Sequence, residues 1–111
     1  MAFEIILAPQ AMASLKRLSV PVRTGVQEAL ELHLTHEPMK VSKSRIKRLR
    51  GLSQPQYRLR VGDIRVFYDV TETQVQILAI VTKADAQAWL DGQSTPTSDK
   101  GTSGGPGRDQ G

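Results

Sequence analysis

The sequence predicts an α+β fold in which an N-terminal strand and an antiparallel helix pair pack on a mostly antiparallel β-sheet. Three observations support this: a short apolar run opens the chain, two stretches with helical spacing follow, and three strand-like runs come later. The chain has 111 residues, which is the length of one domain. Elements in this order favour helices gathered on one side of a sheet.

The first third of the chain predicts one strand followed by two helices. Residues 3–8 are mostly apolar and form the strand, and Pro9 suits the first turn of a helix because its missing N–H needs no partner there. Apolar residues then recur at helical spacing in two stretches, at Met12, Leu15 and Leu18 and, after the break at Ser19–Pro21, at Val22, Val26, Ala29, Leu30 and His33. Pro38 ends the second helix, since a residue before proline avoids helical backbone.

The second half predicts a three-stranded antiparallel meander over residues 57–61, 64–70 and 75–81. Gly62-Asp63 is a two-residue hairpin turn, with glycine first as a type II′ turn favours. Residues 71–74 form a second, looser turn. The meander therefore supplies most of the expected sheet.

Two less regular segments complete the prediction. Residues 44–49 lie in a polar, basic connection and predict at most one helical turn, while residues 83–90 predict a short C-terminal helix ended by Gly92. We therefore expect one folded domain over residues 1–92. From residue 93 to residue 111 the chain has no large apolar side chain, so this Gly/Ser/Pro-rich tail is expected to be disordered.

The two-residue turn determines which side chains share a face of the sheet. It pairs Arg60 with Arg65 and Arg58 with Phe67, because side chains alternate along a strand. One face is apolar and is expected to pack on the helices: Tyr57, Leu59, Val61, Ile64, Val66, Tyr68 and Val70. The opposite face carries the three arginines and Phe67. A four-residue second turn would add Leu78 beside Phe67 and Ile80 beside Arg65.

Positive charge is concentrated in the middle of the chain. The formal net charge is +4, yet nine of the 15 Lys and Arg residues lie within residues 40–65, where Asp63 is the only acid. Two arginines directly opposite each other destabilise a sheet by about 0.2–1 kcal/mol. A bound phosphate or an acidic side chain would offset that repulsion. A polyanion or acidic protein is therefore an expected partner, and a solvated face partly compensated by Asp69 is the alternative.

The central hairpin resembles a signature of the RelE/ParE superfamily of toxins. Residues 48–52 read RLRGL and residues 57–70 read YRLRVGDIRVFYDV. The family run is leucine-arginine-glycine, then a tyrosine strand with alternating basic residues, then Gly-Asp-Tyr-Arg and an apolar-Tyr strand. The element order is similar as well, and the resemblance covers residues 3–90. It implies a RelE-like fold and a toxin of a type II toxin–antitoxin system.

The resemblance predicts first a RelE-like toxin that binds ribosome-associated messenger RNA and inhibits translation, with two alternatives left open. RelE-like members bind messenger RNA on the ribosome and promote its cleavage as endoribonucleases, which needs a base, cations for the phosphate and an acid. ParE-like members inhibit DNA gyrase. A degenerate, non-catalytic member would keep only antitoxin binding. Either toxin role implies a cognate antitoxin with an acidic, partly disordered segment, for which an arginine face is suited.

Carried over by position, the resemblance assigns residues to an RNA site. Arg58 and Arg60 match strand lysines of the RelE-like group, and Arg65 matches the arginine that holds the scissile phosphate, so these three form the catalytic candidates. The further RNA-binding candidates are Lys47, Arg48, Arg50, Phe67 and Lys83.

The segment after the last strand departs from the RelE-like pattern. RelE-like enzymes carry an arginine and then a tyrosine there, where this chain has Ala84 and Leu90. Arginine is a poor general base because it stays protonated. The resemblance therefore implies the phosphate-holding half of a nuclease site and leaves its acid–base half unmatched. Trp89 is interpreted as an anchor of the last helix, with base stacking as the alternative.

Several other site classes are not expected. The chain has no cysteine, which excludes a disulfide framework and a thiolate zinc site. His33 and His36 lack a nearby third ligand, so we expect no metal and no cofactor, and no glycine-rich phosphate loop precedes a helix. The first residues lack the pattern of a signal peptide or a membrane span. We therefore expect a soluble, cytoplasmic protein without membrane association.

Overall fold

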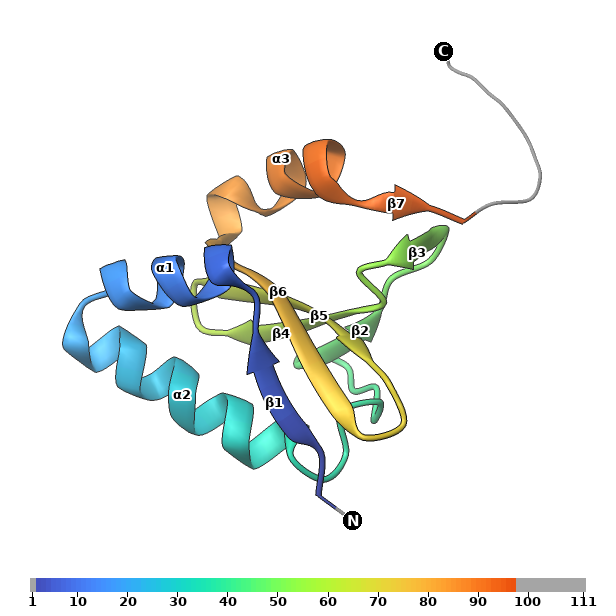
Figure 1. The fold of residues 1–111 in the computed structure, drawn as a ribbon. Coiled ribbons are helices and arrows are strands. Elements are labelled where there is room, and N and C mark those ends of the chain that lie inside the picture. Colours follow the sequence, from blue (N-terminus) through green and yellow to red (C-terminus); the bar gives the residue numbers. More distant parts are fainter. Residues whose placement is uncertain (1, 98–111) are drawn as a thin grey trace.

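The computed structural model describes residues 2–97, which form a five-stranded sheet, a small two-stranded sheet and three helices (Figure 1). The elements are β1 (Glu4–Leu7), α1 (Pro9–Arg17), α2 (Val20–Leu34), β2 (Ile46–Arg48), β3 (Leu52–Gln54), β4 (Tyr57–Val61), β5 (Ile64–Val70), β6 (Gln74–Thr82), α3 (Lys83–Gln93) and β7 (Thr95–Pro96). The strand order is β1-β6-β5-β4-β2, and β3 pairs with β7. Only the β1–β6 pair is parallel in these sheets of the described chain. The predicted α+β fold is confirmed.

The β4–β5 hairpin has the predicted register. Arg60 lies opposite Arg65, and Arg58 lies opposite Phe67. Gly62 has a φ of 58°, the left-handed conformation that a tight hairpin turn requires and that glycine adopts without steric cost. The turn therefore separates apolar and basic side chains onto opposite faces, as alternation along the strands predicts.

The core lies between the α1–α2 pair and the apolar face of the sheet. Its helical side is formed by Ala11, Leu15, Val26, Leu30 and Leu34, and its sheet side by Ile46, Leu59, Ile64, Val66, Tyr68, Val75, Ile77 and Ile80. Two residues predicted on the inner faces of the helices are exposed instead, Met12 at 40% and Val22 at 42%. These two side chains lie at the margin of the stripe that contacts the sheet.

The predicted register between β5 and β6 is wrong beyond Tyr68. The four-residue turn does pair Val70 with Val75, but an irregularity between Phe67 and Tyr68 then shifts the alignment by one residue. Ala79 lies opposite Phe67, and Val81 lies opposite Arg65. A β-bulge adds an unpaired residue to one strand, and here it turns Ile80 into the core, although the simple alternation had placed Ile80 beside Arg65.

Residues 44–49 do not form the predicted helical turn, because their central part is the edge strand β2. Ser42 accepts hydrogen bonds at Oγ from the N–H groups of Arg45 and Ile46, which turns the chain toward the sheet. Ile46 then enters the core opposite Leu59, and Lys47 lies opposite Arg58. Burial of the one large apolar residue here favours a strand over a polar helical turn.

The structure describes the chain as far as residue 97, past the predicted domain boundary at residue 92. Thr82 caps α3 by accepting a hydrogen bond from the N–H of Asp85, and α3 continues to Gln93. Residues Thr95–Pro96 then pair with β3 as β7, although they belong to the tail predicted to be disordered. The rest of that tail, residues 98–111, lies outside the described residues. No helix in residues 2–97 has the length and apolar character needed to cross a membrane.

Tyr68→Phe is expected to destabilise the protein by about 1–3 kcal/mol, because it leaves a buried carbonyl without its donor. The Tyr68 side chain is fully buried, and its hydroxyl donates to the carbonyl oxygen of Pro38 at 2.6 Å. Burial, and then the neighbouring Tyr57, raises the pKa of Tyr68. Neutral Tyr68 thus makes its full contribution to the free energy of unfolding below the unfolded pKa of 10.0, and this contribution falls as pH rises above that value.

Urea denaturation at about pH 7 and about pH 11 measures this effect. The difference between wild type and Tyr68→Phe should narrow by about 1.4 kcal/mol between about pH 7 and about pH 11. An unchanged difference at the two pH values would show that the hydroxyl is not held neutral by the fold.

Candidate functional site

A pocket of about 370 Å³ lies between α3 and the face of the sheet that points away from α1 and α2. It is called the basic pocket here and is lined by Lys47, Leu49, Arg58, Arg65, Phe67, Lys83, Ala86, Gln87 and Leu90. Four of these nine residues are cationic. The sheet supplies Lys47 and the two arginines, and the first residue of α3 supplies Lys83. Residues far apart in the sequence therefore converge into one positive site.

Arg65 is held rigidly at the floor of this pocket. Its side chain is only 8% exposed, and Nη1 donates to the carbonyl oxygens of Gly62 at 2.8 Å and Ile64 at 3.1 Å. Both acceptors belong to the hairpin that carries Arg65. The tight turn thus fixes the direction of the guanidinium. The two carbonyl groups that accept its hydrogen bonds are neutral and do not compensate its charge.

Arg58 lies beside Arg65 without a partner for part of its guanidinium. Its Nε is buried and has no hydrogen-bond acceptor within residues 2–97. Burial lowers the pKa of Arg58, and the charges of Arg65 and Arg60 lower it further. Charges of the same sign repel each other strongly when little water surrounds them. An anion bound in the pocket would offset both this repulsion and the free-energy cost of desolvation.

Asp69 does not provide the compensating charge that the sequence suggested. Its carboxylate accepts from Gln54 Nε2 at 2.7 Å and from the N–H of Gln56 at 2.8 Å. In the part of the chain that the structure describes, the only ion pair within 4.0 Å joins Lys40 and Glu37, away from the pocket. The arginines of the basic pocket therefore have no carboxylate partner among residues 2–97.

Three predicted site residues lie outside the pocket. Arg60 faces Arg65 across the hairpin but is exposed and does not line it. Arg48 lies on the opposite face of β2, where its guanidinium is 5.2 Å from the centre of the Tyr57 ring and donates to the carbonyl of Gln56. Arg50 is exposed in the turn before β3. The pocket thus unites Arg58, Arg65, Lys47, Lys83 and Phe67 from the predicted set.

Phe67 and Trp89 form an aromatic contact between α3 and β5 of the sheet. Their rings stack with centroids 5.0 Å apart and planes 6° apart, and Phe67 is only 1% exposed. One face of the Phe67 ring is therefore occupied by Trp89, which agrees with the interpretation of Trp89 as an anchor of the last helix. The predictions did not include Leu49, Ala86 and Gln87, although Lys83, Ala86, Gln87 and Leu90 recur at helical spacing that indicates one face of α3.

The pocket is positively charged and contains few groups for proton transfer. Its lining within the described chain includes no Asp, Glu, His or Tyr, and arginine stays protonated. Leu90 lines the pocket where the resemblance places a catalytic tyrosine, and Ala84 is exposed. Among residues 2–97, Lys47 and Lys83 are the lining side chains that could transfer a proton.

The two histidines differ in exposure. His33 is half-buried and His36 is exposed. Among residues 2–97, no group of three or more His, Cys, Asp or Glu residues could hold a metal ion. The basic pocket is thus the site with the strongest physical case for a ligand.

The fold resembles solved toxins of known type. RelE in the RelE–RelB complex of the archaeon Pyrococcus horikoshii matches with a TM-score of 0.62 and 26% identity over 75% of this chain and 97% of that chain. The toxin–antitoxin complex of Mycobacterium tuberculosis matches with a TM-score of 0.56 and 22% identity over 74% and 99%. A mutant of E. coli RelE in the free state matches with a TM-score of 0.61 and 18% identity over 80% and 92%. The last two support the fold alone.

Sequence comparison identifies the family. No curated protein matches the chain significantly. The family model described as the ParE toxin of type II toxin–antitoxin system, parDE, matches residues 5–86. That range includes most of β1, the α1–α2 pair, the β4–β5 hairpin and the start of α3. The chain therefore belongs to the ParE family of toxins of type II toxin–antitoxin systems, within the RelE/ParE superfamily.

Proposed function

We propose that this toxin inhibits its target by binding and not by cleavage, and that the target is DNA gyrase. The observation that carries the proposal is the basic pocket, where Arg58 and Arg65 lie together without a carboxylate partner among residues 2–97 and without an Asp, Glu, His or Tyr in the described lining. Membership of the ParE family supports the choice of gyrase over other targets.

The physical basis of inhibition is an anion captured by two desolvated guanidinium groups. An acidic side chain or a phosphate of the gyrase–DNA complex would supply the charge that the pocket lacks. Charge-assisted hydrogen bonds to arginine are about twice as strong as neutral ones, and Arg65 is held in place before the ligand arrives. Preorganisation of this kind reduces the entropy lost on binding.

The same charges favour an acidic antitoxin as the physiological partner. The resembling archaeal RelE was solved with RelB, and the resembling Mycobacterium tuberculosis toxin was solved with its antitoxin. We propose that a cognate antitoxin places a carboxylate near Arg58 and Arg65. The antitoxin and the target would then compete for one pocket. The bound antitoxin would neutralise the toxin by excluding the target from that pocket.

A second candidate function is inhibition of translation through ribosome-associated messenger RNA. Lys47, Arg58, Arg65 and Lys83 converge on the face where RelE-like toxins are expected to hold phosphates. Leu90 takes the place of the expected tyrosine, so cleavage at this site would depend on Lys47 and Lys83 or on groups supplied by the RNA or the ribosome. This observation favours RNA binding over independent nuclease activity.

Expression without an antitoxin separates the two targets. A gyrase inhibitor should arrest growth with filamentation and a DNA damage response while messenger RNA ends remain unchanged. The purified toxin should also block supercoiling by gyrase. New transcript ends within minutes of induction, together with normal supercoiling at excess toxin, would replace gyrase by ribosome-bound RNA. Normal growth would overturn both target assignments.

A further inference from the structure

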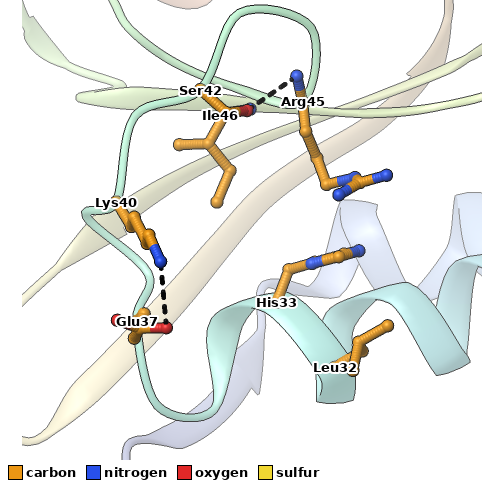
Figure 2. A pocket seen from close by; sticks show the side chains of 7 residues that line it. All are labelled: Leu32, His33, Glu37, Lys40, Ser42, Arg45 and Ile46. Carbon is orange, nitrogen blue, oxygen red and sulfur yellow. Dashed lines mark hydrogen bonds and ion pairs between the residues drawn. The ribbon is translucent and has the colours of Figure 1, made fainter.

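A second pocket lies at the end of α2 and shares no lining residue with the basic pocket. Its volume is about 210 Å³, and its lining residues are Leu32, His33, Glu37, Lys40, Ser42, Arg45 and Ile46 (Figure 2). The last turns of α2 form one side, and the loop leading to β2 forms the other. Three of its four charged or titratable groups, His33, Lys40 and Arg45, are basic.

His33 and Arg45 face each other across this pocket. Figure 2 shows the side chain of Arg45 reaching from the loop toward the imidazole of His33 on α2. Burial lowers the pKa of His33, and the charge of Arg45 lowers it further. The fold thus places two basic side chains close together, which adds a free-energy cost to protonation of the His33 imidazole. A ligand of opposite charge would remove that cost.

The remaining polar groups suit an anion better than a cation. Glu37, the one acid in the lining, lies with Oε1 3.8 Å from Nζ of Lys40, which compensates its charge. Ser42 accepts at Oγ from the N–H groups of Arg45 and Ile46, so it holds the loop that carries Arg45. The hydroxyl proton of Ser42 is left to donate to a ligand.

We propose that this pocket binds a tetrahedral oxyanion, of the phosphate monoester or sulfate type, between His33 and Arg45. Lys40 and the Ser42 hydroxyl supply further donors from the loop. The ligand favours the imidazolium form of His33, because only that form donates from both ring nitrogens. By linkage, oxyanion affinity rises as pH falls. The positive charges of Arg45 and Lys40 oppose protonation of His33, whereas the negative charge of Glu37 favours it.

Sulfate is the first probe, because it keeps its double negative charge throughout the range in which histidine titrates. NMR of the imidazole protons follows His33 and the exposed His36 in the same sample. Added sulfate should raise the titration midpoint of His33 above its value in sodium chloride of equal ionic strength. His36, which does not line the pocket, should titrate alike in the two salts.

Variants test the assignment of the two partners. Arg45→Ala should weaken sulfate binding by roughly tenfold or more, because it removes a charge-assisted hydrogen bond. His33→Gln should retain binding at high pH and lose the increase at low pH. His36→Gln is the matched control and should change neither property. Circular dichroism establishes that each variant is folded before binding is compared.

Two nucleotide probes identify the source of the oxyanion. Tighter binding of adenosine monophosphate than of a dinucleotide with one internal phosphate supports a phosphate monoester as the ligand, and the reverse overturns that assignment in favour of a phosphodiester of a nucleic-acid backbone. The proposal is overturned if sulfate shifts His33 no more than chloride does. It is equally overturned if, at a pH low enough to protonate His33, both His33→Gln and Arg45→Ala bind sulfate as tightly as the wild type.

Discussion

Arg58→Ala is expected to abolish toxicity while leaving the fold as stable as before. Arg58 is half-buried beside Arg65, its Nε has no acceptor within residues 2–97, and its charge is opposed by both neighbouring arginines. Removal of one partner from a buried charged contact costs a complex about 2–5 kcal/mol. The affinity for the target should therefore fall by roughly 30-fold to several thousand-fold.

The stability of the toxin should change much less. The variant loses packing of the arginine stem but also loses repulsion from Arg65, so the free energy of unfolding should change by no more than about 1 kcal/mol. Growth after induction, inhibition of gyrase supercoiling and urea denaturation measure the three quantities. Stability and toxicity are thereby separated in one variant.

Arg60→Ala is the matched control for this prediction. Arg60 carries the same charge on the same strand and faces Arg65 across the hairpin, but it does not line the basic pocket. It should retain most of the toxicity. Equal loss from Arg58→Ala and Arg60→Ala would indicate that a diffuse positive face, and not the pocket, recognises the target.

Trp89→Ala is expected to give the largest loss of stability and to dismantle one wall of the basic pocket. Trp89 stacks on the buried Phe67 ring at 5.0 Å and attaches α3 to the sheet. Its removal should cost about 3 kcal/mol, which lowers Tm by roughly 12–24 °C for a domain of this size. Lys83, Gln87 and Leu90 would lose their positions over Arg58 and Arg65, so toxicity should fall as well.

Trp89→Phe tests whether the aromatic ring or the indole N–H matters. The indole Nε1 is buried and has no hydrogen-bond partner in the described part of the chain, so phenylalanine removes an unsatisfied donor while it keeps the stacking. Thermal unfolding should give a Tm close to that of the wild type, and toxicity should persist. A Trp89→Phe protein that is stable but not toxic would show that the indole itself contacts the target.

The local pattern was sufficient to predict the hairpin and the two faces of its strands. Gly62 tolerates the positive φ of a tight turn, and the alternation of Tyr57, Leu59 and Val61 with basic residues then determines what faces the helices. These properties depend on neighbouring residues alone. The pairing of Arg60 with Arg65 could be predicted for the same reason.

Other features depend on contacts between distant segments and were missed. Ile46 forms part of an edge strand because Leu59 and the core accept its side chain, and Thr95–Pro96 are ordered because β3 offers them a partner. The bulge near Phe67 and Tyr68 has no turn residue to signal it. Each of these choices is decided by packing and pairing that a local pattern does not contain.

The sequence by itself determined the order of the elements, the hairpin register and the concentration of positive charge, because all three follow from spacing and residue type along the chain. The tertiary structure alone decided which cations share a pocket. It placed Arg48 and Arg60 outside and drew Lys83 in through α3, which the Phe67–Trp89 stack holds against the sheet. Composition specifies only the number of charges, whereas an anion-binding site requires charges at fixed positions with little water between them.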